Sequence, residues 1–410
     1  MPFPIERVRG QFPALGDPRR VFFDAPGGTQ LCAPAIEAMK AHCEGGTANL
    51  GGNFSTSRDV GALSEAARSA VADLLGADPA EIAFGPNMTS LTLAVSRALA
   101  RDWTAGDELV VTRLDHDANI APWLAVAEDR GMTVRWLDFD RHSCALDLAA
   151  LPALLGPRTR LVAVGGASNA VGTLNDLAAI CAIVRAHSTA LVYADAVQSV
   201  PHVVTDVAAL GCDFLAFSPY KVFGPHQGVL WARPTALDGV RPYKVRPAPA
   251  QPPIRGFETG TAAFEALAGV LGMVGYLEWL GAGYVAETAS RRERLAAAMH
   301  ANSAYEADLG AMLLDGLGTL PGVRLHGPAT PAGRVPTFGL TIEGWAPHDI
   351  ALEMGNRGVN CWAGHFYAIE TIERLGLAQS GGLLRLGLCH YNTAEEVTRC
   401  ISALDEIISK

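Results

Sequence analysis

Short apolar runs alternate with helical stretches through the first two thirds of the chain. Runs at residues 81–84, 108–112, 133–137, 159–164, 190–194, 212–217 and 228–231 predict strands. Segments between them, such as 91–101, 120–130 and 177–186, have the spacing of helices. Strands that alternate with helices favour a parallel sheet covered by helices. The pattern therefore predicts an α/β domain built on a mostly parallel sheet.

The pattern changes after a long helical segment at about 287–317. Apolar runs at 323–325, 335–342, 359–362 and 383–388 then predict the strands of a smaller α+β domain. A capping box at Thr393-Ala-Glu-Glu396 begins the last helix. We expect a large domain over residues 20–285 and a small domain made of residues 1–19 together with 286–410.

Composition narrows the class of protein. The 410 residues are 49% hydrophobic and 18% charged, which is typical of a compact globular chain. A net charge of -10 argues against a nucleic-acid or anionic-membrane partner. The first residues resemble neither a signal peptide nor a transit peptide, so we expect a cytoplasmic protein. The eight cysteines form no CxxC pair, which favours free thiols and no metal site.

Lys221 is the residue with the most unusual surroundings. A lysine is usually a solvated charge, but this one follows the apolar run at 214–217 within Ser218-Pro-Tyr-Lys-Val-Phe-Gly-Pro-His226. Burial lowers the pKa of an ammonium group and supplies the neutral amine that a Schiff base needs. The sequence therefore predicts a reactive amine.

Asp195 ends the apolar run at 190–194, one predicted strand before Lys221. A buried carboxylate is unfavourable unless a cation meets it. The cation is either a pyridinium nitrogen or a structural partner, such as an arginine or a helix N-terminus. Because parallel strands gather their carboxyl ends at one edge of the sheet, Asp195 and Lys221 are expected to lie close together. The pair favours a pyridoxal-type cofactor.

Two glycine-containing turns each leave two interpretations open. Gly85-Pro-Asn-Met-Thr-Ser90 joins a strand to a helix, which predicts either a phosphate site or an ordinary N-cap by Thr89 or Ser90. The turn Ala25-Pro-Gly-Gly28 either lets the backbone approach a ligand or only reverses the chain.

Six ordered motifs, spread over about residues 20–405, resemble those of class V aminotransferase-fold enzymes, most closely the cysteine desulfurase and selenocysteine lyase subfamily. They are Asp115-His-Asp-Ala-Asn-Ile-Ala-Pro-Trp123, Ala167-Ser-Asn-Ala-Val-Gly-Thr173, Ala194-Asp-Ala-Val-Gln-Ser-Val-Pro-His202, Ser218-Pro-Tyr-Lys-Val-Phe-Gly-Pro225, Arg255-Gly-Phe-Glu-Thr-Gly-Thr261 and Tyr391-Asn-Thr-Ala-Glu-Glu396. The resemblance implies the aspartate aminotransferase-like fold (fold type I) and pyridoxal 5'-phosphate as cofactor.

The same resemblance implies a role for each matching residue. Lys221 would form the Schiff base and move protons, Asp195 would hold the pyridinium proton, and His116 would stack on the ring. Polar contacts to the cofactor would come from Met88, Thr89, Asn169, Gln198, Ser218, Tyr220 and, from the other subunit of a homodimer, Thr261. Arg385 would bind the substrate carboxylate beside Asn169.

The chain departs from the desulfurase pattern in Asn360-Cys-Trp-Ala-Gly-His-Phe-Tyr367. Trp362 stands where the resemblance implies an arginine, and Tyr367 stands where it implies the persulfide-forming cysteine. A phenol cannot replace a thiolate nucleophile. Cys361 is either a core residue or a displaced nucleophile, and the former is favoured. Trp362 and Tyr367 would line the substrate side.

These departures predict a C–S lyase that acts on cysteine or, preferably, on an S-substituted cysteine. Similar enzymes serve specialised antibiotic or thiol metabolism. Decarboxylation-coupled oxidative deamination of an S-cysteinyl conjugate, desulfuration, transamination and epimerisation remain alternatives.

Overall fold

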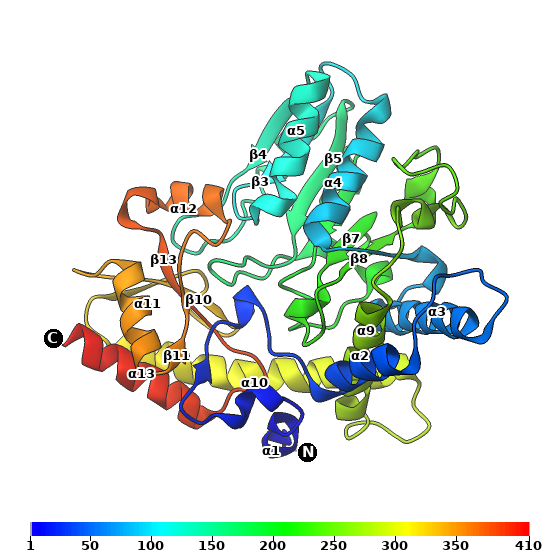
Figure 1. The fold of residues 1–410 in the computed structure, drawn as a ribbon. Helices are drawn as coiled ribbons and strands as arrows, with labels where there is room; N and C mark the ends of the chain where they lie inside the picture. Colours follow the sequence, from blue (N-terminus) through cyan, green and yellow to red (C-terminus); the bar gives the residue numbers. More distant parts are fainter. Residues whose placement is uncertain (1, 410) are drawn as a thin grey trace.

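The computed structural model describes residues 2–409, so the first and last residues of the predicted small domain lie outside the described part. The larger sheet has seven strands in the order β2-β8-β7-β6-β5-β3-β4 (Figure 1). Neighbouring strands from β7 to β4 pair in parallel, whereas β8 is antiparallel to β7 and β2. The predicted mostly parallel sheet is thus present. The strands are β2 (Ile82–Gly85), β3 (Glu108–Thr112), β4 (Thr133–Leu137), β5 (Thr159–Gly165), β6 (Leu191–Asp195), β7 (Phe214–Phe217) and β8 (Gly228–Ala232).

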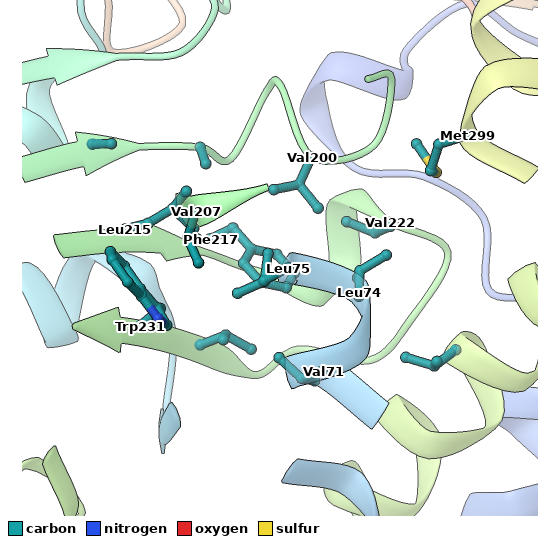
Figure 2. Packing of buried hydrophobic residues seen from close by; sticks show 14 of the residues in the cluster. Val71, Leu74, Leu75, Val200, Val207, Leu215, Phe217, Val222, Trp231 and Met299 are labelled. Carbon is teal, nitrogen blue, oxygen red and sulfur yellow. The ribbon is translucent and has the colours of Figure 1, made fainter. Parts of the chain in front are cut away.

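Helices cover both faces of this sheet, and each face has its own apolar core. One face packs against α4 (Met88–Leu99) and α5 (Ala121–Arg130). The other face packs against α3 (Ser55–Leu75), α7 (Leu177–His187) and α9 (Phe264–Gly281). Figure 2 shows side chains of α3, among them Leu75, beside Leu215 and Phe217 of β7. The remaining helices of this region are α2 (Ala33–Gly45), α6 (Leu151–Leu154) and α8 (Val207–Leu210).

The small domain has a second sheet in the order β12-β13-β10-β9, and all its pairs are antiparallel. Helix α10 runs along the molecule from the α9 side to the small domain (Figure 1). The strands are β9 (Val323–His326), β10 (Thr337–Ile342), β12 (Trp362–Gly364) and β13 (Leu383–Gly387), and the helices are α1 (Ile5–Arg9), α10 (Arg291–Thr319), α11 (Pro347–Asn356), α12 (Ile369–Leu375) and α13 (Ala394–Ile408). Within residues 2–409, no helix is both long and apolar enough to cross a bilayer.

The single strand predicted at 359–362 is two strands in two different sheets. Strand β11 (Val359–Asn360) pairs in parallel with β1 (Val21–Phe22), and β12 then pairs with β13. The apolar run continues across the junction, so hydrophobic patterning carried no sign of this change of partner. The break turns Trp362 and the residues after it toward the carboxyl edge of the large sheet.

Of the two interpretations of the turn at 85–90, an N-cap by Thr89 or Ser90 is wrong. The helix begins at Met88, and the Asn87 side chain accepts a hydrogen bond from Ser90 N at 2.8 Å. Asn is as good an N-cap as Ser and better than Thr, and here it lies two residues before Thr89 and three before Ser90. Thr89 does not cap the helix and lies at its N-terminus, where it lines the cavity at the carboxyl edge of the sheet.

Candidate active site

The sheet brings most of the predicted site residues together at its carboxyl edge. His116 follows β3, Asn169 follows β5, Asp195 ends β6, and Lys221 follows β7. They line adjoining cavities, together with Met88, Thr89, Gln198, Ser218 and Tyr220. The small domain supplies the opposite wall with Trp362, Tyr367 and Arg385, and the larger of the two cavities has a volume of about 920 Å³. Thr261 is exposed and does not line either cavity.

Lys221 is a buried amine, with 8% of its surface exposed. Its Nζ donates a hydrogen bond to the Pro26 carbonyl and lies 5.1 Å from the centroid of the Tyr220 ring. The pKa of Lys221 is lowered to about 7, chiefly by burial and also by the Arg385 charge, while Asp195 acts in the opposite direction. Near neutral pH, Lys221 is therefore a neutral nucleophile in a large fraction of the protein molecules.

We expect the cofactor-free protein to form a Schiff base with pyridoxal phosphate faster as the pH rises through about 7. The reacting species is the neutral amine, and an ordinary lysine with a pKa of 10.5 would remain protonated over this range. The measurement is borohydride trapping at short times between about pH 5.5 and 9, with mass spectrometry of the Lys221 peptide. A trapping rate that keeps rising tenfold per pH unit above pH 8 would contradict the lowered pKa.

Asp195 is buried, and its Oδ1 accepts a hydrogen bond from Val197 N at 2.9 Å. The pKa of Asp195 is raised to about 7, chiefly by burial and also by the nearby Asp115, while the hydrogen bond from Val197 N acts in the opposite direction. Asp115 is held by Thr112 and Asn119, each at 2.7 Å, and burial raises its pKa to about 6. A cation placed against Asp195 would remove the penalty for ionising this carboxyl group.

The N-terminus of α4 forms the end of the cavity that is rich in donors. Met88 N donates to Ser218 Oγ at 3.0 Å, which leaves the Ser218 hydroxyl proton available to a ligand. Thr89 lies in the first turn, where backbone N–H groups and the helix dipole favour an anion. Tyr220 stacks on His226 with ring centroids 4.8 Å apart. These donors suit a phosphate group.

His116 is a neutral ring. Its Nδ1 accepts a hydrogen bond from Ala118 N at 3.0 Å, so the proton of the neutral imidazole lies on Nε2. Burial lowers the pKa of His116 to about 4, with further contributions from the charges of Lys221 and Arg385. Tyr367 stacks on the imidazole at 5.5 Å.

The two predicted amides are held by backbone carbonyls. Asn169 Nδ2 donates to Phe366 O at 2.8 Å, and Gln198 Nε2 donates to Pro26 O at 2.8 Å. Asn169 Oδ1 is buried and has no partner among residues 2–409. An unsatisfied buried oxygen at the edge of the cavity marks a place for a hydrogen-bond donor that a ligand brings.

Arg385 is a buried cation with unused donors. Its Nη1 donates to Asn169 O at 2.9 Å, its guanidinium lies 4.1 Å from the centroid of the Phe366 ring, and Nε has no partner within the described residues. Burial lowers the pKa of Arg385 to about 9, while Asp24 acts in the opposite direction. The group remains charged at neutral pH and suits a bidentate carboxylate.

An aromatic wall, Trp362 to Tyr367, closes the cavity on the small-domain side. A Cβ on Gly27 would lie 2.5 Å from Trp362 Nε1, so the indole occupies the space that glycine leaves. Phe366 and Tyr367 both have positive φ, at 52° and 58°, a strained conformation for such residues. The hydrogen bond from Asp117 N to Tyr367 O, at 2.7 Å, helps to hold this segment.

Cys361 packs with the small-domain core and does not line either cavity. Burial raises the pKa of its thiol to about 12. A thiol that is almost never ionised is a poor nucleophile. The placement agrees with the interpretation of Cys361 as a core residue.

The cavity also has lining residues that were not recognised as site residues, among them Pro26, Gly27, Leu93 and Asp117. The first two belong to the turn at 25–28, for which close approach to a ligand was one of two interpretations. Asp117 stands inside a recognised motif beside His116. Leu93 had no sequence signal, because an apolar residue on a helix is ordinarily a core residue.

The donor set of the site fits pyridoxal phosphate. The α4 N-terminus with Thr89 and Ser218 suits the phosphate, Asp195 suits the ring nitrogen, and Lys221 suits the aldehyde. The partnerless Asn169 Oδ1 and the buried amine of Lys221, which lacks a hydrogen-bonded carboxylate, are polar groups that such a ligand would satisfy.

The sequence profile described as "Aminotransferase class-V" matches residues 21–400. A probable cysteine desulfurase of Pseudomonas putida is 33% identical over 97% of this chain and 97% of its own length. A cysteine desulfurase of Klebsiella pneumoniae is 31% identical, and 99% of each chain is covered. An aminotransferase-like protein of Gibberella zeae is 31% identical over 99% of each chain.

Solved structures show the same likeness. The apo cysteine desulfurase of Thermococcus onnurineus superposes with a TM-score of 0.88 at 26% identity, covering 100% of this chain and 99% of that one. A cysteine desulfurase of Escherichia coli gives a TM-score of 0.81 at 27% identity, with 99% of each chain covered.

Proposed function

Because this chain belongs to the class V aminotransferase family, we propose that it is a pyridoxal phosphate-dependent carbon–sulfur lyase acting on an S-substituted cysteine. The family and the fold type predicted from the six motifs are confirmed. The choice of an S-substituted cysteine over free cysteine is the finer part of the proposal.

One observation carries that choice. The cavity contains the amine of Lys221 and the guanidinium of Arg385, but no cysteine among residues 2–409 lines it. Tyr367 occupies the place where a desulfurase-like sequence would carry its thiol, and a phenol cannot accept sulfur from a substrate. Sulfur therefore leaves with its substituent, as a thiol.

Pyridoxal phosphate, when bound, supplies an electron sink for the charge that develops at the substrate Cα. Arg385 binds the substrate carboxylate, and the Asp195 carboxylate holds positive charge at the ring nitrogen. Lys221 Nζ takes the proton from Cα, a step that its lowered pKa permits near neutral pH. His116, neutral with its proton on Nε2, covers the ring and excludes water. The carbon–sulfur bond breaks with its electron pair going to sulfur, which leaves as a thiol, and one water then converts the released aminoacrylate to pyruvate and ammonia.

The cavity beyond Lys221 is apolar and suits a large substituent. Leu93 of α4 is 41% exposed although it is a leucine, and it lines the cavity together with Ala121, Pro122 and Ala125. Trp362 and Tyr367, 51% and 64% exposed, lie on the other wall. Exposed apolar surface gathered in one cavity is typical of a ligand site. We infer an apolar group on the substrate sulfur.

Replacing Leu93 with alanine is expected to lower kcat/KM for S-benzylcysteine about fivefold to tenfold, and to leave S-methylcysteine almost unchanged. Only the larger substituent reaches the Leu93 side chain. Thiol and pyruvate are measured on the loaded enzyme. Leu352→Ala is the control, because Leu352 is 59% exposed on α11, away from the cavity.

The same assay tests the proposal as a whole. Equal amounts of thiol and pyruvate from S-benzylcysteine, at higher kcat/KM than from cysteine, are the expected result. Carbon dioxide without thiol would indicate decarboxylative deamination, and a cofactor converted to its amine form would indicate transamination. A persulfide on Cys361 after incubation with cysteine would restore the desulfurase function and overturn the proposal.

The proposal includes a homodimer in a cytoplasmic, specialised antibiotic or thiol pathway. Thr261 is exposed and lies outside the cavities of its own protomer, which leaves it free to reach the phosphate end of a partner's site. A mixed dimer pairs a Thr261→Ala protomer with a Lys221→Ala protomer. It shows whether Thr261 acts on the site of its own protomer or on the site of its partner.

A further inference from the structure

A second cavity, of about 490 Å³, lies between a loop of the large domain and the small sheet. The loop supplies Arg141, and β9 supplies Arg324 and the buried His326. The lining residues of this cleft differ from those of the Lys221 cavity. What it binds is therefore independent of the proposed lyase activity.

The two arginines of this cleft lack acidic partners. Neither guanidinium makes an ion pair or a hydrogen bond to any of residues 2–409. Most arginines elsewhere are paired; Arg374, for example, contacts Asp138 at 2.7 Å. In the described part of the chain, no carboxylate side chain lines the cleft. Two unpaired guanidinium groups beside one cavity create a field that favours an anion.

The acid closest in sequence, Asp140, is already engaged in holding the loop. Its Oδ1 accepts hydrogen bonds from His142 N at 3.0 Å, Ser143 N at 2.8 Å and Ser143 Oγ at 3.0 Å. Cys144 N donates to Asp140 O at 2.7 Å, and Thr173 Oγ1 donates to Cys144 O at 2.9 Å. The turn that presents Arg141 is thus fixed before any ligand arrives.

Apolar side chains also line the cleft. They are Ile342, Trp345, Pro347, Leu375 and Leu377. Trp345 is half-buried, so part of its indole is available for contact. A cleft lined both by cationic groups and by aromatic and aliphatic groups matches a ligand with an anionic head and an apolar body.

We propose that this cleft binds a small amphipathic anion, whose carboxylate or phosphate head lies between Arg141 and Arg324 and whose apolar body packs on Trp345.

The test is calorimetric titration of the pyridoxal phosphate-loaded enzyme at constant ionic strength, with the phosphate end of the Lys221 site already filled. The probes are phenyl phosphate, 3-phenylpropionate, inorganic phosphate and benzyl alcohol. We expect at least one of the two amphiphiles to bind at least about tenfold more tightly than inorganic phosphate and benzyl alcohol. If phenyl phosphate binds more tightly, the head group is a phosphate; if 3-phenylpropionate does, the head group is a carboxylate.

An Arg141→Gln/Arg324→Gln double variant is expected to weaken that binding by at least about tenfold. Arg130→Gln is the matched control, because Arg130 is exposed on α5 and does not line the cleft. Trp345→Ala should reduce binding of the amphiphiles toward that of inorganic phosphate. Circular dichroism and thermal unfolding check that the variants fold.

Three results would overturn the assignment. The first is unchanged binding in the double variant, and the second is binding that Arg385→Gln abolishes while the double variant keeps it, which would place the probe in the Lys221 cavity. The third is failure of both amphiphiles to saturate the enzyme below about 10 mM.

Discussion

Replacing Lys221 with alanine is expected to abolish borohydride-stable attachment of pyridoxal phosphate and to lower lyase activity by about a thousandfold or more. Among residues 2–409 the cavity offers no second lysine amine, because neither Lys40 nor Lys244 lines it. The visible absorption band of the loaded protein should disappear with the attachment.

Lys40→Ala is the control for this variant. Lys40 lies on α2 at the surface, 3.9 Å from Glu44, and does not line the cavity. The trapped peptide from the wild-type protein should contain Lys221 alone. Retention of the band in Lys221→Ala, or trapping on another lysine at equal yield, would refute the central role of this residue.

Replacing Asp195 with asparagine is expected to lower kcat by about a hundredfold to a thousandfold while Schiff-base attachment at Lys221 persists. An amide has nearly the shape of the carboxylate but cannot hold positive charge on the ring nitrogen. Borohydride trapping and turnover of S-benzylcysteine separate the two effects. Asp129→Asn, on the exposed face of α5, serves as the control.

Stability gives a second readout for Asp195 that does not depend on activity. Burial raises the pKa of Asp195 to about 7 from 3.8, so the folded, cofactor-free state binds a proton more tightly than the unfolded state. The contribution of this group to the free energy of unfolding is greatest below pH 4 and falls as the pH rises toward 7. Each pKa unit corresponds to about 1.4 kcal/mol.

Asp195→Asn removes the carboxyl group whose ionisation lowers the free energy of unfolding. The variant without cofactor should therefore gain stability relative to wild type as the pH rises from 5 to 8. Thermal unfolding across that range measures the difference. A difference in melting temperature that does not change with pH would show that Asp195 is not the buried titrating group.

The sequence by itself determined the large sheet and most of the cofactor side of the site. Apolar runs separated by helices require parallel strands, and parallel strands bring their carboxyl ends to one edge. Lys221 and Asp195 had to meet because each follows such a run. The six motifs then indicated the family, which the profile match confirms.

Only the tertiary structure decided the substrate side. Trp362 covers Gly27, Phe366 lies against Arg385, and Leu93 of α4 opposes the aromatic wall. These contacts join residues that are far apart in the chain, across two domains and a change of strand partner at 360–362. Local hydrophobic patterning reports which residues are apolar, but it does not report which distant apolar residues will share a cavity.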